Sequence, residues 1–281
     1  MSWLLVNQAL ADLMSQPALS SERSSQILLG EAARLLDRRD EWTEIRLERD
    51  GYAGWVQTAA LVECGEERVR EYTSASQTVV TGEIVQAFLE PERRAYAGKL
   101  PCGIRLPGVE RRDGSVALEL PDGRRWWVAA SDTQAASELP RPDRDGIAAT
   151  LRSMRRHVGV PYLWGGCSPF GYDCSGLTQS FWSLLGVRIP RDADQQFQAG
   201  EPVAGPPLPG DLLFFSLNAS GGERPRHADI RHVGIALGDH EMLHASGKAR
   251  AVAVDELGTG RSVYGDWLHD HLAGVRRYAC G

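Results

Sequence analysis

The sequence predicts an α+β fold in which two small all-β barrels precede a domain of helices and sheet. In the first half of the chain, short apolar stretches alternate with Gly, Asp and Pro turns, a pattern typical of small antiparallel barrels. After residue 147, helical periodicity comes first and apolar, strand-like runs follow. A length of 281 residues suffices for two domains, or for three if some of them are small barrels.

The first barrel is expected over residues 1–66. Polar and apolar residues alternate through Thr43, Ile45 and Leu47, and a tight turn follows at Asp50-Gly51. Strands this short, separated by Gly and Asp turns, favour a small antiparallel barrel. The run DGYAGWV resembles the last hairpin and the closing strand of the bacterial SH3 domain.

A second, diverged SH3-like barrel is expected over residues 67–133. Strand-like runs cover Thr78–Val80 and Ile84–Phe88, and a terminal hairpin is predicted where VALEL and RRWWVAA flank a Pro121-Asp122-Gly123 turn. Residues 134–146 are polar, contain proline and lack apolar periodicity. They are therefore predicted to form a linker.

The third domain is expected over residues 147–281, and it begins with an amphipathic helix. Asp143 or Asp145 is available as the N-cap of this helix. Apolar residues at helical spacing mark its buried face, namely Ile147, Leu151, Met154 and Val158.

A second helix is predicted to begin near Cys174 and to end at Gly186. Its apolar face consists of Leu177, Phe181, Leu184 and Leu185. Three strand candidates follow, which are LLFFSL from Leu212, HVGIAL from His232 and MLHAS from Met242. Helices followed by strands are the order of an α+β domain.

Charge and composition exclude several kinds of partner. The 31 Lys and Arg residues against 37 Asp and Glu residues leave a net charge of −6, which attracts neither nucleic acid nor an anionic membrane surface. No run of about 20 apolar residues occurs, and Asp12 interrupts the N-terminal apolar stretch, which has no basic residues before it. Five cysteines at irregular spacings argue against a secreted disulfide framework. We therefore expect a globular, cytoplasmic protein.

Cys174 is the strongest candidate for a catalytic residue. It follows the Gly-containing run GGCSPFGYD, so its sulfur is expected in the first turn of the second helix. Free N–H groups at a helix N-terminus stabilise thiolate over thiol, and thiolate is the nucleophilic form. A neighbouring His would lower the thiol pKa further and could protonate a leaving amine. His232 and His244, on two consecutive predicted strands, are the candidates for this base and for the residue that orients it.

Five ordered motifs, YLWGG, YDCSGL, IPRDADQQ, PGDLLFF and HVGIAL, resemble those of the NlpC/P60 cysteine peptidases, whose core is papain-like. The resemblance covers about Ile147 to Tyr278. It implies that Cys174 is the nucleophile, that His232 is the general base and acid, and that His244 orients His232. It also implies amide hydrolysis through a thioester, without a cofactor, and a Tyr beside the thiol that would be Tyr162.

Within that family, the chain resembles the branch that carries bacterial SH3 domains before the catalytic domain. That branch cleaves between D-γ-glutamate and the following diamino acid in murein peptides with a free N-terminal L-Ala. The resemblance implies that Asp173 and Ser175, which flank the nucleophile, contact this free amine. An acylated amine would leave the Asp173 carboxylate unpaired, at a cost of a few kcal/mol. The implied substrate is therefore a soluble L-Ala-γ-D-Glu-diamino acid peptide, in a recycling role.

Several alternatives stay open at this point. The same chemistry could act on intact, exported peptidoglycan, or the chain could be a non-catalytic wall-peptide binding module. The SH3-like domains could anchor the protein to wall polymer or limit the substrate to short peptides, and the second role is favoured. Arg191, within IPRDADQQ, could contact substrate or form a structural ion pair, and the ion pair is favoured. The diamino acid, diaminopimelate or lysine, and the oligomeric state are left undecided.

A metal site is disfavoured. His240 and His244 are four residues apart and could be joined by Cys167, Cys174 and His232, but no HExxH pattern is present. The Gly-rich segment also lacks a Walker motif, so phosphate binding is disfavoured as well.

Overall fold

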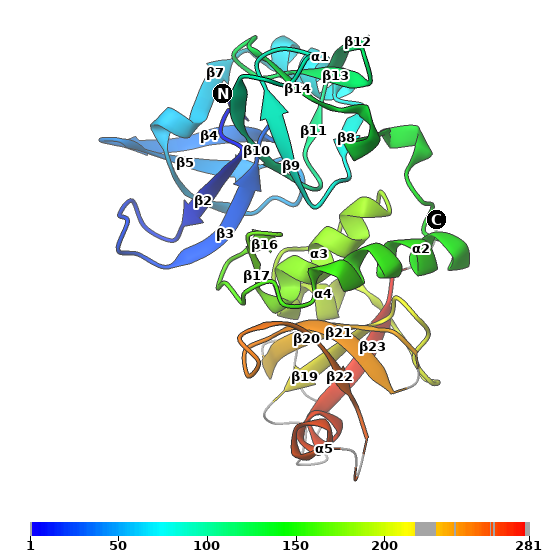
Figure 1. The fold of residues 1–281 in the computed structure, drawn as a ribbon. Helices are drawn as coiled ribbons and strands as arrows, with labels where there is room; N and C mark the ends of the chain where they lie inside the picture. Colours follow the sequence, from blue (N-terminus) through cyan, green and yellow to red (C-terminus); the bar gives the residue numbers. More distant parts are fainter. Residues whose placement is uncertain (1, 217–228, 239, 259, 261, 279–281) are drawn as a thin grey trace. The chain divides into compact units, whose positions relative to one another are not determined.

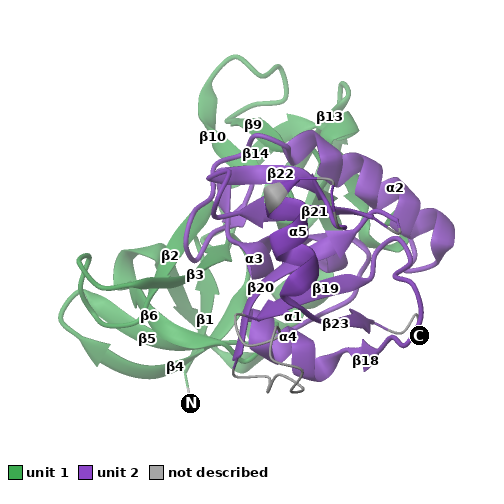
Figure 2. Ribbon diagram, turned by 90° about the horizontal axis from the view of Figure 1, so that it is seen from below, with its two compact units in different colours: residues 1–139 green, residues 140–281 purple. Residues whose placement is uncertain are grey.

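The computed structural model describes residues 2–216, 229–238, 240–258, 260 and 262–278. The chain divides into two compact units, residues 1–139 and residues 140–281 (Figure 2). Unit 1 is built mainly of strands, and unit 2 combines helices with one main sheet, so the predicted α+β fold is confirmed. In the described part of the chain, no helix combines the length and the apolarity needed to cross a bilayer.

The first part of unit 1 is a seven-stranded antiparallel sheet with the order β3-β2-β6-β5-β4-β1-β7. Alternating residues, such as Ile45 and Leu47, enter its core. The predicted turn at Asp50-Gly51 is present, and Gly51 has a φ of 73° that glycine adopts without strain. The strands are β1 (Trp3–Val6), β2 (Leu10–Met14), β3 (Arg23–Leu28), β4 (Ala32–Arg39), β5 (Trp42–Leu47), β6 (Ala53–Gln57) and β7 (Leu61–Cys64).

The second part of unit 1 contains a five-stranded sheet, β10-β9-β14-β13-β12, and a three-stranded sheet, β11-β8-β15. Its core also includes Trp3, Leu5 and Leu29 from the first part, so this core spans both parts, beside the separate core of the first sheet. The elements are α1 (Glu66–Ala75), β8 (Thr78–Val80), β9 (Ile84–Phe88), β10 (Tyr96–Pro101), β11 (Arg105–Leu106), β12 (Gly108–Arg112), β13 (Ser115–Glu119), β14 (Arg125–Ala129) and β15 (Thr133–Ala135).

Two of these elements differ from the sequence-based expectation. Helix α1 buries only Val69 and Tyr72, so its apolar stripe is too short to stand out in the sequence. The Tyr72 hydroxyl fixes α1 by donating a 2.8 Å hydrogen bond to the Glu119 carbonyl. Strand β15 lies partly in the predicted linker, where pairing with β8 supplies the order that the local sequence does not.

Unit 2 contains a six-stranded sheet with the order β18-β23-β19-β20-β21-β22. The predicted strands from Leu212, His232 and Met242 are confirmed as β19, β20 and β21. The strands are β16 (Cys167–Ser168), β17 (Gly171–Tyr172), β18 (Glu201–Pro202), β19 (Leu212–Ser216), β20 (Ile230–Ala236), β21 (Glu241–Ser246), β22 (Ala251–Glu256) and β23 (Leu272–Arg277). The helices are α2 (Arg144–Met154), α3 (Cys174–Leu184), α4 (Ala193–Ala199) and α5 (Val263–Asp270).

The two faces of this sheet support two separate cores. Leu212 and Phe214 point toward the core that contains α2, α3 and α4. Leu213 and Phe215 point toward a smaller core that contains Leu268 of α5. Figure 1 shows the same arrangement, with α5 on the side of the sheet opposite α3.

The predicted caps of both helices are largely confirmed. Asp143 caps α2 by accepting a 2.9 Å hydrogen bond from the Gly146 N–H. Gly186, with a φ of 76°, follows the end of α3. The expectation that Val158 belongs to the apolar face of α2 is wrong, because α2 ends at Met154 and Val158 is 50% exposed.

Candidate active site

Cys174 is the first residue of α3, as the sequence predicts. Its side chain is only 8% exposed. Asp173 is the N-cap of the helix and accepts a 2.6 Å hydrogen bond from the Gly176 N–H. Gly176 must be glycine, because a Cβ there would lie 2.1 Å from the carbonyl oxygen of Gly166. The loop before the helix therefore packs directly against its first turn and fixes the thiol.

The Asp173 carboxylate is fully engaged within unit 2. Its two oxygens accept hydrogen bonds of 3.1 and 2.7 Å from Arg191, and Oδ2 also accepts one of 2.9 Å from the Gly165 N–H. Arg191 is 1% exposed and also donates a 2.9 Å hydrogen bond to the Ser175 hydroxyl. The structural ion pair favoured for Arg191 is confirmed. The expectation that an acylated substrate would leave the Asp173 carboxylate unpaired is wrong, because Arg191 already pairs with it.

Gln196 joins the same cluster, although sequence reasoning did not single it out. Its amide nitrogen donates to the carbonyls of Ser175 and Pro190, at 3.1 and 2.8 Å. Its amide oxygen accepts a 2.7 Å hydrogen bond from the Thr178 hydroxyl. The IPRDADQQ motif thus fastens the start of α3 with two buried side chains, Arg191 and Gln196.

His232 and His244 meet on neighbouring strands, and a third residue extends the chain. His232 Nε2 lies 2.6 Å from His244 Nδ1, and His244 Nε2 lies 2.8 Å from Asp255 Oδ2. Asp255 is ionised, since the hydrogen bond from His244 holds the pKa of this carboxyl below its usual range. The network therefore assigns the His244 proton to Nε2 and the His232 proton to Nε2. Nδ1 of His232 is left as a proton acceptor.

The strands separate where the two imidazoles meet. Strands β20 and β21 pair only at Ile235 with Leu243 and at Ala236 with Met242. At Gly234, a Cβ would lie 2.7 Å from the Met242 sulfur and 3.1 Å from the His244 Cβ. Glycine in the HVGIAL motif therefore gives His244 room to approach His232.

The thiol lies against β20. The N–H groups of Val233, which follows His232, and of Ser175 are hydrogen-bonded to the Cys174 sulfur. Burial nevertheless raises the pKa of the thiol to about 12, and the nearby Asp173 carboxylate acts in the same direction. The expectation that the helix N-terminus leaves the thiol with a lowered pKa is therefore wrong, because burial outweighs the N–H groups.

His232, on the strand that the thiol contacts, also has a shifted pKa. Burial lowers the pKa of His232, and His244 lowers it further. Both directions favour the uncharged thiol and the uncharged imidazole over a thiolate–imidazolium pair. A thiol of this kind can become nucleophilic by giving its proton to the acceptor nitrogen of His232.

Tyr162 lies close to the thiol and is partly buried. Burial raises the pKa of its hydroxyl, and the charges of Cys174 and Asp173 raise it further. The structure therefore brings Tyr162, Asp173, Ser175 and Cys174 together. His232 and His244 adjoin them through the contact of the thiol with β20.

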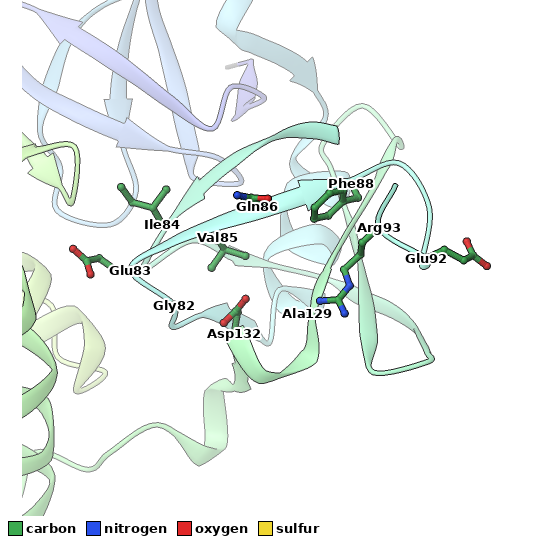
Figure 3. A pocket seen from close by; sticks show the side chains of 10 residues that line it. All are labelled: Gly82, Glu83, Ile84, Val85, Gln86, Phe88, Glu92, Arg93, Ala129 and Asp132. Carbon is green, nitrogen blue, oxygen red and sulfur yellow. The ribbon is translucent and has the colours of Figure 1, made fainter. Parts of the chain in front are cut away.

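Neither a metal centre nor another catalytic constellation is evident among the described residues. No group of three or more His, Cys, Asp or Glu side chains in those ranges could hold a metal ion. A hollow of about 850 Å³ lies in unit 1, and it presents carboxylates and one guanidinium but no thiol or imidazole (Figure 3). Its lining residues are Gly82, Glu83, Ile84, Val85, Gln86, Phe88, Glu92, Arg93, Ala129 and Asp132.

Comparison with known proteins shows which families and relatives the chain resembles. Residues 159–277 match the NlpC/P60 family, and residues 13–61 match the bacterial dipeptidyl-peptidase SH3 domain. A gamma-D-glutamyl-L-lysine dipeptidyl-peptidase from Bacillus cereus is 26% identical over 270 residues, covering 92% of this chain and 76% of that protein. Peptidoglycan endopeptidase RipB from Mycobacterium tuberculosis is 36% identical over 192 residues, covering 62% of this chain and 71% of that protein.

A solved structure is also similar in fold. The crystal structure of an NlpC/P60 family protein from Bacillus cereus ATCC 10987 has a TM-score of 0.83. The match covers 98% of this chain and 99% of that chain, at 23% identity.

Proposed function

Because the chain belongs to the NlpC/P60 family and carries a matching bacterial SH3 domain, we propose that it is a cysteine peptidase for murein peptides. The proposed reaction is hydrolysis of the bond between D-γ-glutamate and an L-diamino acid, in soluble peptides with a free N-terminal L-Ala. The single observation that carries the proposal is the hydrogen-bonded chain from His232 through His244 to Asp255, which starts on the strand whose Val233 N–H is hydrogen-bonded to the Cys174 sulfur.

The proposed mechanism follows from the protonation of this chain. Nδ1 of His232 accepts the thiol proton as the Cys174 sulfur attacks the γ-carbonyl carbon of D-glutamate. Backbone N–H groups near Cys174, such as that of Ser175, would stabilise the oxyanion, and the hydroxyl of Tyr162 would assist. The protonated His232 then gives its proton to the leaving amine of the diamino acid, and a thioester forms. Water, deprotonated by His232, releases L-Ala-D-Glu and restores the thiol.

The relay stabilises the transient positive charge on His232. Asp255 is ionised and fixes the tautomer of His244, whose Nδ1 accepts from His232. The charge that develops on His232 is thus compensated through His244 by a carboxylate that is already present.

Asp173, Ser175 and Tyr162 are proposed to lie against the amino end of the peptide. The name of the Bacillus cereus relative, a dipeptidyl-peptidase, supports release of a dipeptide from a free N-terminus. Arg191 already neutralises Asp173, so an acylated amine meets no unpaired carboxylate. We therefore expect discrimination against acylated peptides to rest on the space around the amine more than on charge.

The test is mass spectrometry of the full chain with L-Ala-γ-D-Glu-diaminopimelate and, in parallel, with its N-acetylated form. We expect L-Ala-D-Glu to appear from the free peptide, and we expect the acetylated peptide to remain uncleaved. Cys174→Ala should abolish cleavage, whereas Cys167→Ala, at another buried free cysteine of unit 2, should retain it. Undiminished hydrolysis by the Cys174→Ala protein would overturn the proposal.

A second candidate is hydrolysis of intact peptidoglycan. The relationship to peptidoglycan endopeptidase RipB favours it. It predicts that the protein releases stem peptides from purified sacculi and cleaves the acetylated peptide as well. A non-catalytic binding module would bind both peptides and cleave neither, and the complete relay behind His232 argues against it. The predicted cytoplasmic location is a separate proposal, which cell fractionation tests.

A further inference from the structure

Lys248 lies on the turn that joins β21 to β22. We call residues 247–250 the basic turn, because it carries Lys248 and Arg250, both exposed. Ser246 pairs with Ala251 across its base, and the Ser246 hydroxyl accepts a 3.1 Å hydrogen bond from the Ala249 N–H. These contacts hold the turn in one conformation.

Two tyrosines contact the basic turn. The Tyr162 N–H donates a 2.9 Å hydrogen bond to the Arg250 carbonyl. Lys248 Nζ lies 4.2 Å from the centre of the Tyr264 ring, a cation–π contact. The Tyr264 ring in turn stacks on His244, with the ring centres 6.3 Å apart.

Both tyrosines lie within electrostatic range of the thiol. Burial raises the pKa of Tyr162, and Cys174 raises it further. Burial also raises the pKa of Tyr264, and the charges of Asp255 and Cys174 raise it further. A hydrogen bond with Ser246 lowers it in part. The ammonium of Lys248 therefore lies against the ring of Tyr264, which in turn stacks on His244.

The charge of Lys248 is available to a ligand. Among the residues that the structure describes, no carboxylate is ion-paired with Lys248. The facing carboxylate, Asp255, accepts a hydrogen bond from His244, and Lys248 affects its pKa less than His244 does. The exposed Arg250 adds a second positive charge to the same turn. A carboxylate of a bound peptide would therefore find here a cation that contacts the Tyr264 ring but has no ion-pair partner among the described residues.

We propose that Lys248 selects the diamino acid of the substrate, favouring one whose side chain ends with a carboxylate. This inference rests on the proposed function. Diaminopimelate carries a distal carboxylate beside its distal ammonium, whereas lysine carries the ammonium alone. The other carboxylates of the two tripeptides are the same, so only the distal end distinguishes them. Lys248 attracts the distal carboxylate of the first and repels the ammonium of the second.

The experiment compares two tripeptides, L-Ala-γ-D-Glu-diaminopimelate and L-Ala-γ-D-Glu-L-Lys. Cleavage is measured as kcat/KM for the unsubstituted chain and for Lys248→Met, which keeps an apolar side chain over the Tyr264 ring and removes the charge. Lys99→Met, at the other lysine of the chain, is the matched control. Affinities for both peptides are measured in a Cys174→Ala background, so that the selection is tested independently of hydrolysis.

We expect a higher kcat/KM for the diaminopimelate peptide than for the lysine peptide. The ratio of the two values should fall about 5-fold in Lys248→Met, since an exposed ion pair contributes up to about 1 kcal/mol, and it should be unchanged in Lys99→Met. The preference should also shrink as NaCl rises from about 0.05 to about 0.5 M. An unchanged ratio of affinities in Lys248→Met, or an equal loss for both peptides, would overturn the inference. Preserved selective binding without any cleavage would instead overturn the proposed function and leave the role of Lys248 standing.

Discussion

Replacing Arg191 with Met should destabilise unit 2 strongly. Arg191 is 1% exposed and donates two hydrogen bonds to Asp173 and one to Ser175. Removing one partner of a buried ion pair typically costs about 3–5 kcal/mol, because the other charge stays buried and uncompensated. Asp173 retains its hydrogen bonds from the N–H groups of Gly165 and Gly176 in this variant. We therefore expect a loss of unfolding free energy at the lower end of that range, about 3 kcal/mol.

A loss of that size is large compared with the stability of a domain, which is about 5–15 kcal/mol. Hydrogen exchange of the α3 backbone amides in the full chain reports it for unit 2 alone. A loss of about 3 kcal/mol accelerates exchange through unfolding by about 100-fold. Arg155→Met is the matched control, since Arg155 pairs with Glu241 at 3.3 Å in solvent and the expected cost is about 0–1 kcal/mol.

A double-mutant cycle separates the ion pair from the packing of the Arg191 side chain. Asp173→Asn keeps a cap for α3 and removes the charge. The loss of unfolding free energy in the double variant Asp173→Asn, Arg191→Met should therefore be smaller than the sum of the two single losses, by about 2 kcal/mol. Additive effects would refute the reasoning. So would an Arg191→Met protein whose α3 amides exchange no faster than those of Arg155→Met.

Two further perturbations test the histidine relay. Asp255→Asn should lower kcat more than it changes KM, because His244 loses the carboxylate that fixes its tautomer. Equal kcat values for the parent and for Asp255→Asn would contradict the assigned His244 tautomer. The folded-state pKa of Asp255 is lowered, so its stabilisation is present above the unfolded pKa of about 3.9 and is lost as pH falls through the folded pKa. The difference in unfolding free energy between the parent and Asp255→Asn should therefore be largest near neutral pH and vanish in acid, as urea titrations would show. Gly234→Ala should reduce kcat with little effect on secondary structure by circular dichroism, since its Cβ meets Met242 and His244; an active Ala variant would contradict that reading.

Local signals made the start of α3 predictable. Asp173, Cys174 and Gly186 act within a few residues of their own positions, through capping and through the backbone conformation. The pairing of His232 with His244 was anticipated from a family resemblance, and the room beside Gly234 lets the two imidazoles meet where β20 and β21 separate.

Features that depend on distant packing were not anticipated. Asp255 lies on β22, and it reaches His244 because the register places Ala253 opposite His244 and Asp255 two residues further on the same face. The alternation in AVAVDE was the available signal, but it does not identify the partner strand. The pKa of Cys174 was misjudged for a related reason, since burial is set by the whole core and not by the first helical turn.

The reacting groups are supported from opposite sides of one sheet. Cys174 packs with Val233 in the core of α2, α3 and α4. His232 pairs across the strands with Phe215, whose side chain belongs to the core of α5, and His244 contacts Tyr264 of that helix. Substitutions around α3 can thus alter the reactivity of the nucleophile, whereas substitutions around α5 can alter proton transfer by His232 and His244.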